Sequence, residues 1–207
     1  MFKGTPEIIA QRREEIVAAC EQLYQTMSFR DITLKEISSV TSFSRPTIYN
    51  YFHTKEEIFL ALFEREYDRW NSDLEDILNS EKDFTGRELA DQIAKSLERR
   101  PQLLKLLSMN NFDMEENSRE ELLASFKTAY GKSLKLFRAI LGKHCSGMSE
   151  AEAEQILYVF FPFMFGIFPY AEVTAKQKEA MTEAEVDYKY QSIYEITYNC
   201  LIRLFRD

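Results

Sequence analysis

Residues 33–57, TLKEISSVTSFSRPTIYNYFHTKEE, constrain the fold of this chain more than any other stretch. Thr33 and Glu36 have the spacing of a capping box, in which each side chain satisfies a backbone N–H of the other residue, so a short helix is predicted to begin there. The segment Ser42-Phe43-Ser44 is predicted to end this helix. Pro46 then suits the first turn of a second helix, where a missing N–H costs nothing.

A second capping box, Thr54 and Glu57, predicts the start of a third helix. Two short helices joined by a turn of three or four residues make a helix-turn-helix, whose second helix enters the major groove of DNA. The sequence therefore makes double-stranded DNA the leading candidate for a partner.

The rest of the chain also predicts helices, because Gly and Pro are sparse and no alternating strand pattern is sustained. We expect an all-α fold. The first helix should begin at Thr5 and Pro6. The later capping-box spacings are Thr85/Glu88, Ser118/Glu121, Ser149/Glu152 and Thr182/Glu185. The expected later helices lie near 55–78, 85–98, 101–110, 117–143, 149–171 and 182–206.

The charge of the chain is unevenly distributed. The net charge is −8, yet residues 1–55 carry seven basic and six acidic side chains. The first 55 residues, here called the head, are nearly neutral, and the rest of the chain, here called the body, is acidic. This distribution fits a protein that binds a specific DNA sequence and has weak non-specific affinity, and it does not fit a protein that coats DNA.

Other sequence features narrow the class of protein. No run of about 18 uncharged apolar residues is present, so no membrane span is expected. The charged N-terminus lacks the apolar core of a signal peptide, and a cytoplasmic location is expected. Cys20, Cys145 and Cys200 have no metal or redox spacing and are interpreted as structural thiols. We expect that the protein is not an enzyme and that it has no catalytic residue, metal or cofactor. His144 and Cys145 are adjacent, and we interpret this as a chance pairing.

Residues 8–60 resemble the DNA-binding domain of the TetR family of bacterial repressors. The most specific block is Thr47-Ile-Tyr-Asn-Tyr-Phe-His-Thr-Lys-Glu56, which matches the recognition helix of the family and its exit. Leu34-Lys-Glu-Ile37 matches the preceding helix. Ser42 stands where the family usually has glycine. The resemblance covers the first quarter of the chain and implies a helix-turn-helix domain in 1–54 and a helical ligand-binding and dimerisation domain in 55–207.

The recognition helix supplies the candidate DNA contacts. Arg45 can reach guanine O6 and N7 in bidentate fashion, although it could also be a solvated arginine. Tyr49 could meet a thymine methyl or pack in the core. Tyr51 and Lys55 carry donors suited to phosphate oxygens, and the first turn of the third helix could hold the same phosphate. The full set of predicted DNA-binding residues is Lys35, Arg45, Pro46, Thr47, Tyr49, Asn50, Tyr51 and Lys55.

The segment from Tyr158 to Tyr170 is apolar nearly all round and contains Pro162, Pro169 and Gly166. The family resemblance implies that it lines a ligand cavity and feeds a dimer interface, whereas core packing is the alternative. The candidate ligand-binding residues are Phe112, Phe126, Tyr130, Phe137, Phe161, Phe165 and Phe168. Because this lining is aromatic, we expect an apolar or aromatic small-molecule effector.

We therefore expect a transcriptional regulator, a ligand-responsive repressor that binds an inverted-repeat operator as a homodimer. The alternative is a helical interaction module that keeps the head as a fold and reads no DNA. The homodimer is expected to use helices 149–171 and 182–206. Its candidate contacts are Leu157, Phe160, Phe161 and Phe168 on the first, and Ile193, Ile196, Leu201 and Leu204 on the second.

Overall fold

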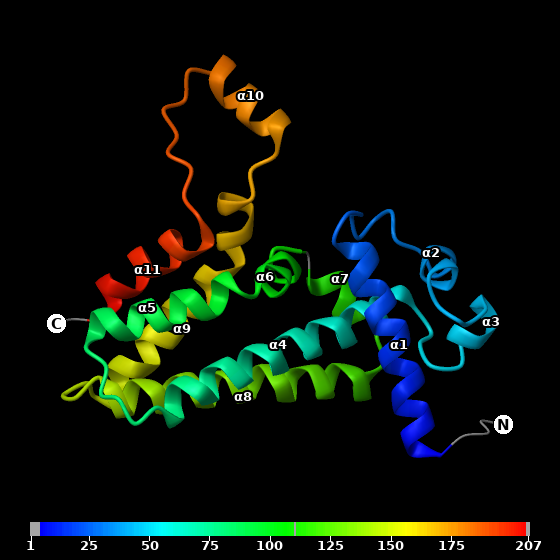
Figure 1. Cartoon of the computed structure of the whole chain (residues 1–207), viewed down its shortest axis with the longest axis horizontal. Helices are drawn as coiled ribbons and strands as arrows, with labels where there is room; N and C mark the ends of the chain where they lie inside the picture. Colours follow the sequence, from blue (N-terminus) through cyan, green and yellow to red (C-terminus); the bar gives the residue numbers. More distant parts are fainter. Residues whose placement is uncertain (1–4, 110, 206–207) are drawn as a thin grey trace. The chain divides into compact units, whose positions relative to one another are not determined.

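The structure is a computed structural model that describes residues 5–109 and 111–205, and in these residues it is all-helical, as predicted. Figure 1 shows the order of the helices along the chain. Their bounds are α1 Pro6–Tyr24, α2 Leu34–Ser39, α3 Arg45–Ile48, α4 Lys55–Asn79, α5 Gly86–Glu98, α6 Pro101–Leu107, α7 Asn111–Glu116, α8 Glu120–His144, α9 Glu150–Ala171, α10 Ala175–Glu183 and α11 Ile193–Leu204.

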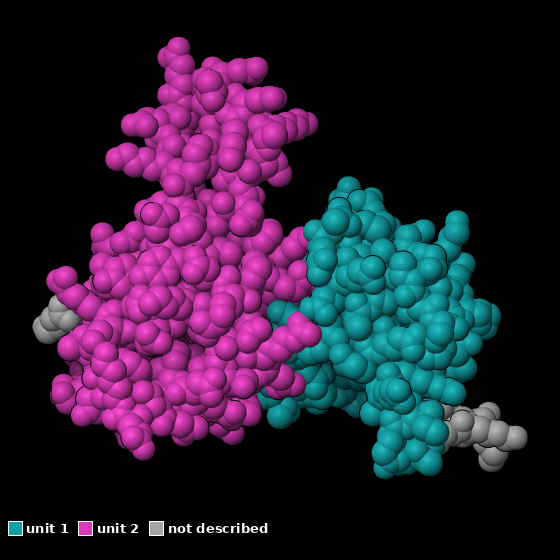
Figure 2. Space-filling view, in the orientation of Figure 1, with its two compact units in different colours: residues 1–66, 110–130 teal, residues 67–109, 131–207 magenta. Residues whose placement is uncertain are grey.

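The chain forms two compact units (Figure 2). The first comprises residues 1–66 and 110–130, and the second comprises residues 67–109 and 131–207. The long helices α4 and α8 each contribute residues to both units. The start of α4 belongs to the first compact unit. The predicted domain boundary between residues 54 and 55 stays a prediction.

The first unit is built around apolar side chains that the three N-terminal helices and the start of α4 supply. Ile16, Ile37 and Ile48 are fully buried. Tyr24 packs edge-on against Phe59 with 5.1 Å between ring centroids. These residues follow the helical spacing of the sequence, so the local pattern alone is enough to place the core of the helix-turn-helix.

The second unit has Trp70 at its centre. Its ring is fully buried, packs 5.8 Å from the Phe161 ring, and donates a 3.0 Å hydrogen bond from Nε1 to Ser96 Oγ. A buried indole N–H needs such a partner, because an unmet donor would carry a desolvation penalty. Helix α11 packs on α5 and α9, which completes this unit.

Helix α9 is apolar on two faces. One face is buried and comprises Ile156, Leu157, Phe160, Phe161, Met164 and Ile167. The other is exposed and includes Tyr158, Val159, Phe165 and Tyr170. The helix is long and apolar enough to cross a membrane by length and composition, but the core helix of a globular protein passes the same test. Pro162 and Pro169 lie within one unbroken helix.

This arrangement corrects the predicted dimer contacts. Leu157, Phe160 and Phe161 are buried within the protomer, and so are Ile193 and Leu201 of α11. They cannot meet a second copy without unpacking their own core. The reason for the error is that an all-round apolar helix has no polar face from which its orientation can be inferred.

The predicted helix 182–206 is also wrong at its start. Helix α10 ends at Glu183, residues 184–192 contain no helix, and α11 begins after Ser192. The true capping box is Ser192 with Glu195, in which the Glu195 N–H donates to Ser192 Oγ at 3.1 Å. The boxes predicted at Thr85 and Ser149 are confirmed.

Replacing Ser192 by alanine is therefore expected to destabilise the protein by about 1 kcal/mol, the usual contribution of an N-cap. Thr182→Ala is the matched control, because Thr182 lies inside α10 and is exposed, so its loss should change stability by less than about 0.5 kcal/mol. Urea denaturation of both variants measures the difference. Equal stabilities would show that the α11 cap contributes nothing.

Candidate nucleic-acid interface and effector site

The turn between α2 and α3 is held by side chains from within the first unit. The backbone N–H and the hydroxyl of Ser42 both donate to the Glu15 carboxylate of α1, at 2.9 and 2.7 Å. These bonds lower the pKa of Glu15. Among the described residues other than glycine, only Glu185 has a positive φ, so Ser42 replaces the usual glycine without left-handed strain.

Helix α3 is short, but its helical hydrogen bonds continue beyond Ile48. The N–H of Tyr49 donates to Arg45 O at 3.2 Å, and the N–H of Phe52 donates to Ile48 O at 3.0 Å. Ile48 and Phe52 are fully buried and anchor this segment. The predicted recognition segment is therefore a short helix that continues as a helical turn.

Because Ile48 and Phe52 bury one side of this segment, most of the predicted base-contacting side chains lie on the opposite side and face solvent. Tyr49 is 44% exposed, so the alternative in which it packs in the core is not what the structure adopts. Thr47 is half-buried and its hydroxyl lies 2.9 Å from that of Ser44. The other exposed members of the predicted set are Lys35, Arg45, Pro46 and Asn50. Their contacts with DNA stay a prediction.

The two predicted phosphate-binding residues already have partners in the protein. Tyr51 is buried and its hydroxyl accepts a 3.1 Å hydrogen bond from Arg12 of α1. Lys55 donates to the carbonyls of Phe29 at 2.8 Å and Ile32 at 3.3 Å. An ammonium has three donors, so a phosphate contact from Lys55 is compatible with both bonds. Sequence reasoning missed Arg12, because only the fold brings α1 next to the end of the recognition segment.

A part-buried ion pair joins the start of α4 to the residue that precedes α8 within the first unit. Glu57 is 1% exposed, and its carboxylate accepts from Arg119 Nε at 2.7 Å and from Arg119 Nη2 at 2.9 Å. The same guanidinium donates to the carbonyl of Tyr51 at 3.2 Å. Burial raises the pKa of Glu57, but hydrogen bonds from Arg119 and His53 outweigh it and the pKa is lowered. Arg119, which directly precedes α8, therefore links the start of that helix to the recognition segment.

The seven candidate ligand-binding aromatics occupy different environments. Phe137 and Phe161 are buried with their rings 5.7 Å apart, and Phe126 packs 4.8 Å from Phe63 in the first unit. Tyr130 and Phe168 are half-buried, whereas Phe112 is 82% and Phe165 43% exposed. None of the seven lines either of the two surface pockets described for this structure. Their role in binding an effector stays a prediction.

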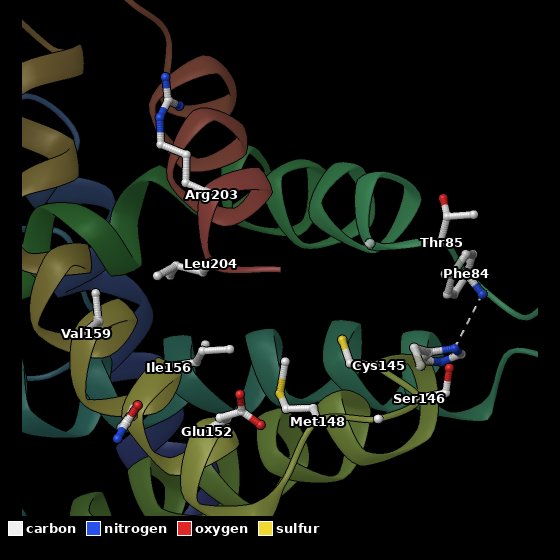
Figure 3. A pocket seen from close by; sticks show the side chains of 14 residues that line it. Phe84, Thr85, Cys145, Ser146, Met148, Glu152, Ile156, Val159, Arg203 and Leu204 are labelled. Carbon is white, nitrogen blue, oxygen red and sulfur yellow. Dashed lines mark hydrogen bonds between the residues drawn. The ribbon is translucent and has the colours of Figure 1, made fainter. Parts of the chain in front are cut away.

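The larger pocket lies within the second unit and has a volume of about 790 Å³. Figure 3 shows Phe84 and Thr85 on one side, Cys145 and Met148 on another, and Ile156 on α9. His144 accepts a 3.4 Å hydrogen bond from the Phe84 N–H at Nδ1. Burial lowers the pKa of His144 and raises that of Cys145. Cys145 and Cys200 are half-buried, whereas Cys20 is fully buried.

Two family models match this chain. Residues 16–62 match bacterial regulatory proteins of the tetR family, and residues 64–189 match the tetracyclin repressor-like C-terminal domain. The chain is 30% identical over 69 residues to the HTH-type transcriptional regulator EthR of Mycolicibacterium smegmatis. That match covers 33% of this chain and 32% of EthR, so the chain spans about a third of the curated relative.

Solved structures share the fold along nearly the whole chain. The transcriptional regulator FadR from Bacillus subtilis, in complex with stearoyl-CoA, has a TM-score of 0.57 at 17% identity, over 93% of this chain and 97% of FadR. A TetR-family transcriptional regulator from Marinobacter aquaeolei has a TM-score of 0.61 at 13% identity, over 94% of this chain and 98% of the other. With the two family models covering the head and most of the body, the chain belongs to the TetR family of bacterial regulatory proteins, a family of DNA-binding transcriptional regulators.

Proposed function

We propose that this protein is a cytoplasmic, ligand-responsive repressor that binds an inverted-repeat operator as a homodimer. The observation that supports it most is the recognition segment, which is anchored by Ile48 and Phe52 and presents Arg45 and Tyr49 to solvent. A helix-turn-helix kept only as a fold would need no such exposed set. The family membership likewise does not favour the alternative of a protein-interaction module that reads no DNA.

Within this proposal, base edges are read by exposed side chains of the recognition segment. The guanidinium of Arg45 contacts guanine, and the ring of Tyr49 meets a thymine methyl. Thr47, Tyr51 and Lys55 contact phosphates, with Arg12 as a further cation beside the Tyr51 hydroxyl. Phosphate contacts set the register on the duplex, and base contacts set the sequence.

The homodimer is proposed to form through α9 and α11, on a face that differs from the predicted one. The exposed strip on α9 comprises Tyr158, Val159, Pro162, Phe165, Pro169 and Tyr170. A contiguous apolar surface of this kind marks an interaction site. Two copies about a twofold axis would cover both strips in a four-helix bundle. Two heads related by this axis would read half-sites about 34–36 Å apart, one turn of DNA.

The effector is proposed to be an apolar or aromatic small molecule bound in the helical body. Its support is the aromatic content of α8 and α9, and FadR, a protein of the same fold, has been solved with stearoyl-CoA. Binding must favour one arrangement of the heads, or it cannot change DNA affinity. Helix α4 is the proposed lever because it contributes residues to both units. A coupling of about 1–3 kcal/mol corresponds to a release of roughly 5- to 150-fold.

Lys55→Ala is expected to weaken binding to all DNA sequences alike and to flatten the dependence of affinity on salt, because one phosphate contact per head is lost. Its bonds to Phe29 and Ile32 also contribute to the fold, so thermal unfolding is measured in parallel. Titrations of specific and random duplexes at several salt concentrations check the prediction. A loss confined to the specific duplex would instead assign Lys55 to base reading.

A selection of random duplexes on the purified protein tests the proposed function. Enrichment of an inverted repeat is expected. Recovery of duplexes without any shared sequence would contradict DNA reading and support the interaction module.

A further inference from the structure

Residues 172–192 form an arm that leaves α9 at its C-terminal end and returns to the start of α11. Figure 1 shows α10 held away from α9 and α11 by the two connecting segments. No residue of α10 is buried, and within the arm only Val173, Met181 and Tyr188 are even half-buried. The arm thus adds nothing to the core of its own protomer.

The arm nevertheless has a defined conformation. Thr174 caps α10 by accepting from the Gln177 N–H at 3.2 Å. At the other end the N–H of Val186 donates to Met181 O at 3.0 Å, and Glu185 takes a left-handed conformation with φ of 53°. These bonds form a Schellman motif, with a non-glycine residue in the position that glycine usually occupies. Isolated helices shorter than about 12–15 residues are marginal in water, and no residue of the nine-residue α10 is buried against its own protomer, so a partner surface would stabilise it.

Where the arm joins α9, Tyr188 of the arm contacts Tyr170, the last residue of the exposed strip of α9. The hydroxyl of Tyr188 donates to the carbonyl of Tyr170 at 3.5 Å, and the two rings lie 6.4 Å apart. Tyr170 belongs to the strip that is proposed as the dimer interface, and it is 60% exposed. The arm is therefore continuous with that interface, and its partner should be the molecule that covers the strip.

Charge indicates where on that molecule the arm lies. The first turns of α10 carry Lys176 and Lys178, both exposed and without an intervening acid. The first turn of α9 carries the exposed Glu150 and Glu152. With the twofold axis at the middle of the strip, antiparallel α9 helices would bring the start of α10 opposite the start of the partner's α9. A parallel arrangement would instead set the lysines of one arm against those of the other, which is unfavourable.

We propose that the arm of one protomer docks on a second copy of this chain, over the start of the partner's α9. The same end of α9 supplies Glu152, Gln155 and Val159 to the lining of the 790 Å³ pocket. The partner's arm therefore forms an outer wall of this pocket, which is incomplete in a single protomer. This inference rests on the homodimer of the proposed function and adds a contact that the four-helix bundle alone does not provide.

Photo-crosslinking tests the proposal on the full chain. The photoreactive residue p-benzoylphenylalanine replaces Lys178, and protein labelled with heavy nitrogen is mixed with unlabelled protein before irradiation. Crosslinks from one protomer to residues 144–159 of the other are expected. A dimer whose crosslinks stay within one protomer, join the two arms or fail to form would overturn the docking while leaving the homodimer in place. A monomer in sedimentation at micromolar concentration would overturn both.

Charge reversal provides a second, independent readout. Lys176→Glu should weaken the dimer on the order of fivefold at low salt, because two symmetric ion pairs become repulsive. Adding Glu150→Lys should restore the dimer dissociation constant. Lys189→Glu, on the returning segment of the arm, is the matched control and should change it less than twofold. Equal effects of Lys176→Glu and Lys189→Glu, or no rescue, would contradict the proposed position of the arm.

Discussion

Replacing Arg45 by alanine is expected to lower operator affinity by about 2–6 kcal/mol, roughly 30-fold or more, because each of two half-sites loses a bidentate contact of about 1–3 kcal/mol. Arg45 is exposed at the start of α3, so the fold should not change. Preference should relax at one base-pair position in each half-site. Fluorescence anisotropy with the selected operator and its single-position variants measures both effects.

Arg30→Ala is the matched control for this prediction. Arg30 is an exposed arginine of the same head and lies outside the recognition segment, so its loss removes the same charge without a base contact. A loss of affinity of less than about threefold, equal for all sequences, is expected. If Arg45→Ala leaves affinity and specificity unchanged, the assignment of the recognition segment is wrong.

Glu57→Gln is expected to destabilise the protein by on the order of 3 kcal/mol at pH 7, because it breaks a bidentate ion pair whose carboxylate is buried. The value lies at the lower end of the usual range because the Arg119 side chain is 34% exposed and can regain water. The melting temperature should fall by roughly 5–10 °C. Thermal unfolding followed by circular dichroism measures it, with Glu56→Gln as the control from the same helical turn.

The penalty of Glu57→Gln should also depend on pH. The folded state lowers the pKa of Glu57 below its ordinary value of 4.5, so the ion pair contributes its full stability above that pH. The contribution is lost as the pH falls through the lowered pKa, where wild type and variant should converge. A penalty that stays constant while the pH is lowered through the titration of Glu57 would show that the charge of Glu57 does not stabilise the contact with Arg119.

The helix-turn-helix could be predicted from the sequence because its signals are local. The cap at Thr33 and the proline at position 46 each act within one turn of helix, and the apolar spacing of α1 defines a single buried face. Ser42 takes the place of the usual glycine without a left-handed backbone, and Glu15 of α1 accepts its hydrogen bond. Local signals do not depend on how the rest of the chain packs.

The body could be predicted only as a set of helices. Helix α9 is apolar on both faces, so its sequence could not show that Phe160 is buried and Phe165 exposed. Thr182/Glu185 and Ser192/Glu195 are equivalent capping signals in the sequence. The helix begins at the second because α11 packs on α5 and α9 from there on. The Glu57–Arg119 pair joins residues distant in sequence, and no local pattern predicts it.

The central claim is that two copies of this chain read one inverted repeat through their recognition segments. Sedimentation of the protein with the selected duplex measures the number of protomers per DNA. Two protomers on the intact repeat are expected, with specific binding lost when one half-site is scrambled. A single protomer per duplex, or equal binding to the intact and the scrambled sites, would contradict the account.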